Sequence, residues 1–189
     1  MVFEYNKIIN VNLDRDTVWS ILKDDLISFS KNIKNVKSIK KLNHIAENEN
    51  IENIKNEWEL DTVIPEFIAA HIKDSYLKYI DDAKWNNKTK ICNYICEPSD
   101  NSKSYTLRGK HTFKEIDENN SIFELSIKLD LDSTKIFPSA FGFLPKWVKK
   151  NPISDKIFEQ VEKFLALSIA DSSDDMMHKL KLYVQKKKS

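Results

Sequence analysis

Glycine is nearly missing from this chain, and its scarcity excludes whole classes of binding site. Only Gly109 and Gly142 occur among the 189 residues, whereas phosphate-binding loops and dinucleotide fingerprints need clustered glycines. Cysteine is equally rare: Cys92 and Cys96 would lie about 13 Å apart in an extended strand, too far for a disulfide. A C-x3-C pair without a neighbouring Cys or His is also a poor metal site. We expect two buried free thiols, no metal and no cofactor.

The chain also lacks a dominant charge and a long apolar run. Thirty basic against 29 acidic residues leave a net charge of +1, so no single-sign field would attract nucleic acid. No stretch approaches the roughly 18 uninterrupted apolar residues of a membrane span, and the N-terminal residues contain no signal-peptide core. We expect a soluble, cytoplasmic protein with no nucleic-acid partner.

What the chain does have is enough apolar side chains for one core. Hydrophobic residues make up 41% of the sequence and aromatic residues 11%, which argues against wholesale disorder. A chain of this length buries roughly 70% of its unfolded surface on folding. Because no linker or shift in composition divides the sequence, we expect a single domain over residues 1–189.

Hydrophobic periodicity predicts a strand and one or two helices at the start. Residues 2–12 alternate between apolar and polar, as a half-buried strand does. Asp14 then offers an N-cap to a helix whose apolar stripe covers residues 18–26. The segment 27–35 favours a second, short helix or a turn. Residues 36–45 have a mixed period, and we interpret them as a strand.

The rest of the chain predicts more strands and a final helix. Cleanly alternating segments, each with one dry and one wet face, are residues 54–64, 104–114 and 122–132. Two further strands, at about residues 76–85 and 89–97, flank a predicted turn at residues 86–88. Residues 153–185 carry apolar side chains at helical spacing, whereas residues 65–72 favour a short helix or lid and residues 133–152 an apolar loop. The order predicts an α+β fold. A curved antiparallel sheet of about six to seven strands would wrap around the long C-terminal helix.

Several stretches of the sequence carry a resemblance to a known superfamily. The chain opens with a strand followed by Asp14-Arg-Asp-Thr-Val-Trp-Ser-Ile-Leu22, and Asn32-Ile-Lys-Asn-Val-Lys-Ser-Ile39 leads into a second strand. Later come Asn56-Glu-Trp-Glu-Leu, Pro65-Glu-Phe-Ile and Trp85-Asn-Asn-Lys-Thr. These resemble the START-like superfamily, also called SRPBCC, which includes polyketide cyclase-like and coenzyme Q-binding proteins. The family's glycine-rich loop between strands two and three has no counterpart here.

This resemblance implies a helix-grip fold with an apolar hollow between the sheet and the C-terminal helix. Alternation and the predicted loop and helix supply the candidate ligand-binding residues: Trp58, Leu60, Tyr94, Tyr105, Leu107, Gly109, His111, Phe123, Leu125, Ile127, Phe141 and Phe164. The same side chains could instead form a filled core. Gly109 leaves a gap in an inward column, or it marks a β-bulge. Asp81 is a further candidate for a polar contact within the hollow.

His111 is the titratable side chain that alternation places most clearly inside. A buried histidine that is hydrogen-bonded to a neighbour is one interpretation, and a ligand-orienting or acid–base role is the other. General acid–base catalysis needs opposed titratable groups in one pocket, and the sequence shows no nucleophile elbow. His111 is therefore the only, and a weak, catalytic candidate, and the pattern favours binding over catalysis.

The sequence thus predicts a protein that binds, and could transport, a hydrophobic small molecule such as a lipid, an isoprenoid or a polyketide-like compound. One alternative is a cyclase- or hydrolase-like enzyme that uses the same pocket. Another is an interaction module, because residues 137–147 place aromatic side chains beside lysines, as segments in transient contact with a membrane do. No residue demands an oligomer.

Overall fold

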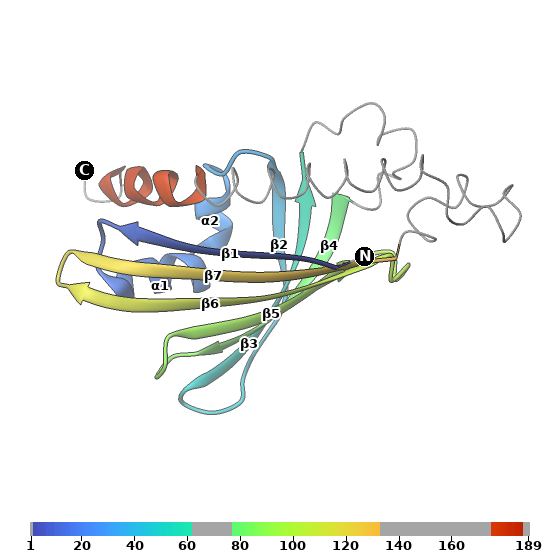
Figure 1. Ribbon diagram of the computed structural model, residues 1–189, viewed down its shortest axis with the longest axis horizontal. Coiled ribbons are helices and arrows are strands. Elements are labelled where there is room, and N and C mark those ends of the chain that lie inside the picture. Colours follow the sequence, from blue (N-terminus) through green and yellow to red (C-terminus); the bar gives the residue numbers. More distant parts are fainter. Residues whose placement is uncertain (1, 62–76, 133–174, 187–189) are drawn as a thin grey trace, which may run out of the picture.

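The computed structural model describes residues 2–61, 77–132 and 175–186. Figure 1 shows their arrangement. The elements are β1 (Val2–Val11), α1 (Arg15–Lys23), α2 (Leu26–Ser30), β2 (Val36–Ala46), β3 (Ile51–Leu60), β4 (Lys78–Asn86), β5 (Ile91–Pro98), β6 (Tyr105–Asp117) and β7 (Asn120–Leu131). Residues 175–186 form a C-terminal helix.

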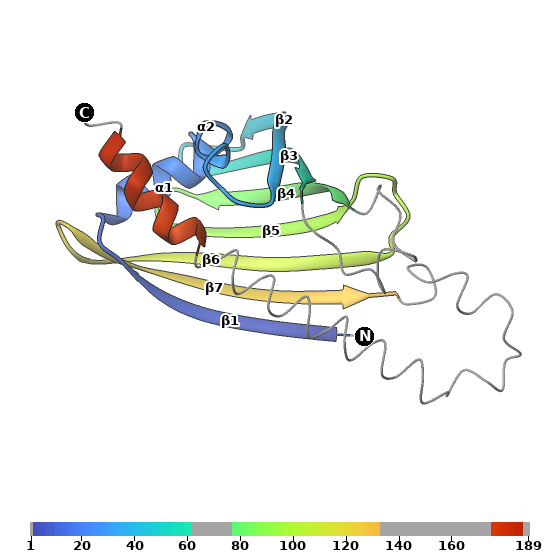
Figure 2. The same ribbon diagram turned by 90° about the horizontal axis from the view of Figure 1, so that it is seen from above.

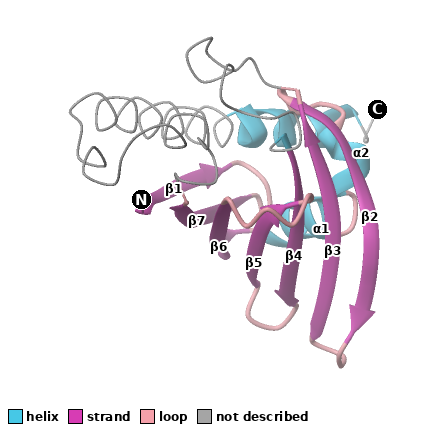
Figure 3. Cartoon of the chain, turned by 90° about the vertical axis from the view of Figure 1, so that its right-hand side faces the viewer, coloured by secondary structure: helices cyan, strands magenta, loops and turns pink. Residues whose placement is uncertain are grey.

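The seven strands form one antiparallel sheet in the order β1-β7-β6-β5-β4-β3-β2. Neighbours in the sheet are neighbours in the chain from β2 to β7, and β1 closes the order by pairing with β7. The sheet curves, and the helices lie on its concave side (Figure 3). The predicted α+β fold class is therefore confirmed.

The mixed period of residues 36–45 has a structural cause in β2. This strand pairs with β3, but the register shifts between Val36 and Ser38 and again between Lys41 and Asn43. Each irregularity changes which side chains face inward, so a strict two-residue alternation cannot persist. β2 is also an edge strand with mostly exposed side chains, which weakens its apolar signal further.

Helix α1 begins at the residue type that the sequence predicts. The carboxylate of Asp14 accepts a hydrogen bond from the backbone N–H of Thr17, 2.8 Å away, and so caps the helix. The apolar face of α1 is buried against the sheet. Met177, Leu180 and Val184 of the C-terminal helix join the same hydrophobic cluster. The helices among the described residues therefore gather at one end of the sheet (Figure 2).

A polar network ties α1 to the sheet at this end. The Glu52 carboxylate of β3 receives hydrogen bonds from Lys23 and Asn87 at 2.6 Å each. A ring nitrogen of His44 also lies 2.6 Å from it. The Lys23 ammonium, followed by these other partners, lowers the pKa of Glu52 to about 2. The indole N–H of Trp19 donates to Asn87, which connects the network to the core.

Several predictions concern residues outside this description. They are the short helix or lid at residues 65–72, the apolar loop at residues 133–152 and most of the predicted helix over residues 153–185.

Both cysteines are buried and free, as expected. None of the helices among the described residues is long and apolar enough to cross a membrane.

Candidate ligand-binding face

The concave face of the sheet has two unlike halves. Near α1, inward side chains such as Ile54, Trp85, Phe113 and Phe123 are buried in the core cluster. Farther along β3 to β6 several inward side chains keep partial exposure, whereas Leu129 and Leu131 of β7 are buried. We call this second region the aromatic half, and it comprises Trp58, Tyr79, Asp81, Tyr94, Tyr105, Leu107 and His111.

Side chains of the aromatic half lie deep in the protein and yet retain accessible surface. Loss of hydration on burial raises the pKa values of Tyr79 and Tyr94 well above their usual range. It lowers the pKa of His111 to about 3. All three residues are nevertheless only partly buried. A mostly aromatic and partly accessible surface on a concave face has the composition that small-molecule sites share.

A polar row crosses this half on three adjacent strands. Register places Asn56 of β3 opposite Asp81 of β4, and Asp81 opposite Cys96 of β5. The Cys96 thiol donates to a carboxylate oxygen of Asp81 over 3.9 Å. Burial raises the pKa of Asp81 to about 7, although hydrogen bonding from Trp58, Asn56 and Cys96 acts in the opposite direction.

Asp81 has hydrogen-bonding neighbours, but no cation lies beside it in the described part of the chain. Unpaired buried charges are costly, so such groups usually pair with a cation or take up a proton. Among the described residues, no ion pair involves Asp81. Asp82, which points to the other face, pairs with Lys55 at 2.8 Å. The adjacent residues Asp81 and Asp82 of β4 thus differ: Asp82 has a cation beside it on the outer face, and Asp81 has none on the inner face among the described residues.

Trp58 contributes an unsatisfied donor to the same region. Its indole Nε1 is buried and has no hydrogen-bond partner, the one such side-chain nitrogen or oxygen in the described part of the chain. The N–H lies close enough to Asp81 to lower the pKa of that carboxyl, but the two do not form a hydrogen bond of ordinary geometry. The ring stacks on Tyr79, with centroids 5.7 Å apart and planes 11° from parallel.

The gap that Gly109 leaves in β6 is occupied by a side chain from the next strand. Gly109 pairs with Tyr94, and a Cβ at Gly109 would overlap with the Tyr94 ring. The register runs without a shift past Gly109 on both sides, so there is no bulge there. The His111 ring lies 4.6 Å from that of Tyr94 and 4.9 Å from that of Phe123, centroid to centroid.

The predicted ligand-binding residues fall into three groups. Phe123, Leu125 and Ile127 are buried in the core cluster with the C-terminal helix, where the filled-core interpretation fits them. Leu60 is half-buried at the end of β3. The remaining described residues are Trp58, Tyr94, Tyr105, Leu107 and His111, which belong to the aromatic half, and Gly109, which lies beneath the Tyr94 ring. Phe141 and Phe164 lie outside the described residues.

Sequence reasoning missed Asn56, Tyr79 and Cys96. A signal for Asn56 was present, because it lies between Ile54 and Trp58 on the inward column and is the only polar residue of the three. Cys96 lies two residues after Tyr94 in β5, so alternation along the strand places both side chains on the inner face. Tyr79 required the exact start of β4, which composition does not give.

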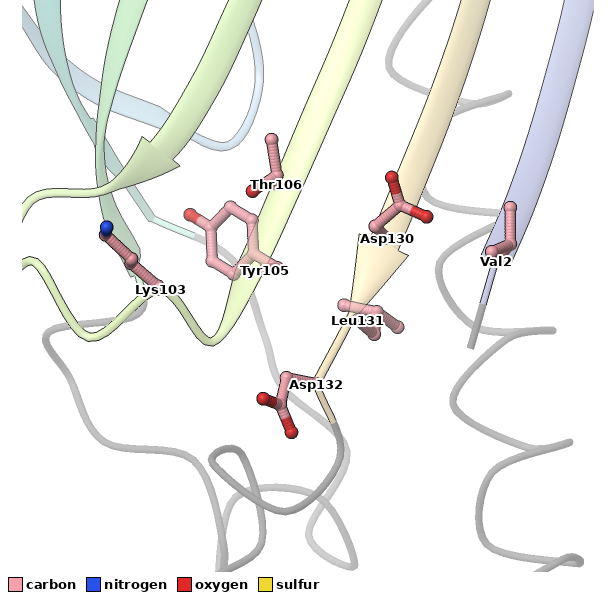
Figure 4. Close-up of a pocket in the computed structure, with 7 residues that line it drawn as sticks. All are labelled: Val2, Lys103, Tyr105, Thr106, Asp130, Leu131 and Asp132. Atoms are coloured by element: carbon pink, nitrogen blue, oxygen red, sulfur yellow. The ribbon is translucent and has the colours of Figure 1, made fainter.

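A pocket lies at the ends of β1, β6 and β7, and it shares Tyr105 with the aromatic half (Figure 4). It has a volume of about 280 Å³ and is lined by Val2, Lys103, Tyr105, Thr106, Asp130, Leu131 and Asp132. Tyr105 and Leu131 come from the inner face, whereas Thr106 and Asp130 come from the outer face. Since this lining is open and largely polar, we regard the aromatic half as the better candidate for an apolar ligand.

The chemistry available in the aromatic half is limited. The imidazole of His111, with its pKa near 3, is a weak base at neutral pH and has no spare proton to donate. Burial also raises the pKa of the Cys96 thiol, which disfavours a reactive thiolate. Asp81, with a pKa of about 7, is the group best suited to exchange a proton. The described residues contain no cluster of three His, Cys, Asp or Glu side chains that could hold a metal ion.

Comparison with known proteins identifies the fold. No protein-family profile matches the sequence, and no curated protein matches it. Among solved structures, TTHA0849 from Thermus thermophilus has a TM-score of 0.63 at 11% identity, over 95% of this chain and 98% of that one. The Zhui aromatase/cyclase from Streptomyces sp. R1128 has a TM-score of 0.58 at 10% identity, over 97% and 96%.

A START superfamily protein from Mycobacterium smegmatis has a TM-score of 0.56 at 6% identity, over 95% of this chain and 98% of that one. At such low identities the likeness concerns the fold alone. The chain has the helix-grip fold of START-like proteins, which confirms the fold that the sequence resemblance implied. Proteins with this fold include cyclases.

Proposed function

We propose that this protein binds a hydrophobic small molecule against the aromatic half of its sheet. The ligand would be of the lipid, isoprenoid or polyketide class. The observation that carries the proposal is the group of aromatic side chains on the concave face of the sheet, among them Trp58, Tyr79 and Tyr94. These side chains keep accessible surface although they point inward.

The energetics favour an apolar ligand in such a place. Covering apolar surface yields about 25 cal/mol per Å² before the costs of ordering are subtracted. The side chains of the aromatic half are mainly aromatic rings and Leu107, and few polar groups are present to fix the orientation of a ligand. A mostly apolar lining with a small number of polar groups is typical of small-molecule sites.

The first test is native mass spectrometry of the purified full-length chain, followed by extraction with organic solvent. We expect a reproducible adduct of a few hundred daltons that extracts into the solvent and so reveals its chemical class. A clean mass of the protein alone, together with no saturable binding of the neutral dye N-phenyl-1-naphthylamine, would contradict the proposal.

Placement of the site can be tested by blocking it. Leu107→Trp fills space on the inner face, whereas Ile95→Trp adds the same ring to the outer face, where Ile95 is 45% exposed. We expect the first variant to weaken binding of N-phenyl-1-naphthylamine at least tenfold and the second to leave it unchanged. Circular dichroism of both variants checks that each is folded. Equal dye binding by the two variants would place the ligand elsewhere.

An enzyme of the cyclase type is a second candidate, favoured by one observation. A carboxyl with a pKa of about 7 is well matched to acid–base catalysis at neutral pH. Incubating the extracted ligand with the wild type and with Asp81→Asn, followed by mass spectrometry of the recovered ligand, tests this role. A product that forms only with the wild type would support an enzyme, whereas unchanged ligand from both proteins supports a carrier.

A further inference from the structure

A buried donor without an acceptor and a carboxyl without a cation lie on neighbouring strands at the same place on the inner face. Asp81 is opposite Asn56, and Trp58 is two residues further along β3 on the same face. The Trp58 N–H is a donor without an acceptor. The Asp81 carboxyl has no cation beside it among the described residues. Its described hydrogen-bonding neighbours are Asn56, Cys96 and the imperfectly placed Trp58.

We propose that Asp81 and the indole N–H of Trp58 together bind a hydroxyl group of the ligand. This inference rests on the proposed function, and it specifies the ligand class as an apolar molecule that carries an alcohol or phenol hydroxyl. The hydroxyl oxygen accepts the Trp58 N–H, and its proton is donated to the Asp81 carboxylate.

The choice of a hydroxyl follows from what each polar group can do. A carbonyl or ether oxygen only accepts hydrogen bonds, so it would satisfy Trp58 but place a lone pair against the carboxylate. An ammonium only donates, so it would satisfy Asp81 and leave the Trp58 N–H without an acceptor. A hydroxyl donates one hydrogen bond and accepts others through a single oxygen. It can therefore accept the Trp58 N–H and donate to the Asp81 carboxylate at the same time.

The surroundings suit the apolar part of such a molecule. Trp58 and Tyr79 stack nearly in parallel and so present adjoining flat surfaces. Around the polar row, Tyr94, Tyr105 and Leu107 are apolar over most of their surface and only partly buried. A site that is built to hydrogen-bond a hydroxyl discriminates strongly against an analogue without one, because its buried polar groups would then stay unpaired.

The test uses three probes of nearly equal shape: 2-naphthol, 2-methoxynaphthalene and naphthalene. Each competes with N-phenyl-1-naphthylamine for the full-length wild type at pH 8, where Asp81 is mostly ionised. Hydrogen bonds to charged groups have a large effect on affinity, so we expect 2-naphthol to bind about tenfold or more tightly than either of the other probes.

Two variants assign that preference to the two residues. Trp58→Phe removes the N–H and keeps a ring, and Asp81→Leu removes the carboxyl and keeps a branched side chain with the same number of heavy atoms. We expect each to reduce the preference for 2-naphthol to below about threefold, while naphthalene still binds. Asp82→Leu is the matched control, because Asp82 is exposed on the opposite face and its loss should leave the preference intact.

The outcomes separate this inference from the proposed function. Equal binding of the three probes to the wild type, or a preference that survives both Trp58→Phe and Asp81→Leu, would overturn the hydroxyl site and leave an apolar binding protein. Failure of the wild type to bind any probe or the dye would overturn both proposals.

Discussion

The ring of Tyr94 lies directly over Gly109 on the neighbouring strand, in the place where any other residue would have its Cβ. Glycine is thus required at this position by a cross-strand contact and not by its backbone, since no glycine among the described residues has a positive φ. The contact also fixes where the Tyr94 ring stands in the aromatic half. The same ring lies against His111.

Replacing Gly109 with alanine should therefore destabilise the protein through Tyr94. The new methyl group overlaps with the ring, and relief of such overpacking typically costs about 1–3 kcal/mol. Urea unfolding of Gly109→Ala measures the loss. In a Tyr94→Ala background the same substitution should cost much less, because the ring is gone. Additive effects of the two changes would contradict a direct contact between these residues.

Asp81 should make the protein less stable as pH rises from about 4 to 7. Its folded pKa of about 7 lies above the ordinary value of 3.8, so the folded state holds a proton that the unfolded state has released in this range. Stability from that proton is complete below pH 4 and is lost by about pH 7, with a slope of up to about 1.4 kcal/mol per pH unit.

Asp81→Asn should remove this slope and leave the protein more stable than the wild type above pH 7. Urea unfolding at several pH values measures the difference between the two proteins. Asp82→Asn, which changes the neighbouring aspartate on the exposed face, is the control and should keep the wild-type slope. A wild-type slope in Asp81→Asn would show that Asp81 is ionised throughout this range.

His111 should make the protein less stable as the pH falls, which is opposite to the trend expected of Asp81. Burial lowers its pKa from 6.5 to about 3, so the unfolded state binds a proton that the folded state does not. Its contribution to stability is complete above pH 6.5 and is lost as the pH falls toward 3. In the Asp81→Asn background, His111→Gln should flatten this acid-side decline. His178→Gln changes an exposed histidine of the C-terminal helix, and it should leave the decline in place.

Glu52 should stabilise the protein by holding α1 to the sheet through Lys23. Glu52→Gln removes the carboxylate from Lys23, whose side chain is only 9% exposed, and leaves that ammonium with Asp24 at 3.2 Å. We expect a loss of about 1–3 kcal/mol at pH 7. Since the folded pKa of Glu52 is about 2, its contribution is present above pH 4.5 and is lost as the pH falls toward 2.

Unfolding of Glu52→Gln at pH 7 and at pH 3 tests this, and the gap from the wild type should narrow at the lower pH. Glu47→Gln is the control: Glu47 pairs with Lys84 at 2.8 Å on the surface, where such pairs contribute little. Equal losses for the two variants would show that the Glu52 network is no more than a surface ion pair.

The sequence predicted local structure well because local signals are periodic. The Asp14 cap, the apolar stripe of α1 and the alternating columns of β6 and β7 are all found as expected. The prediction for β2 was weak because its two register shifts interrupt the alternation. Alternation also placed Trp58, Tyr94 and His111 on the inner face, but it gave no information about which strands would lie side by side.

The amino-acid sequence by itself determined which segments are strands and helices and which side chains face inward, since the two-residue and 3.6-residue periods are properties of the local chain. The tertiary structure decided everything that depends on neighbours from other strands. Register brought Asn56, Asp81 and Cys96 into one row and set Trp58 beside it. The pKa values of Asp81 and His111 were decided in the same way, because they follow from the water that the folded protein excludes from around each side chain.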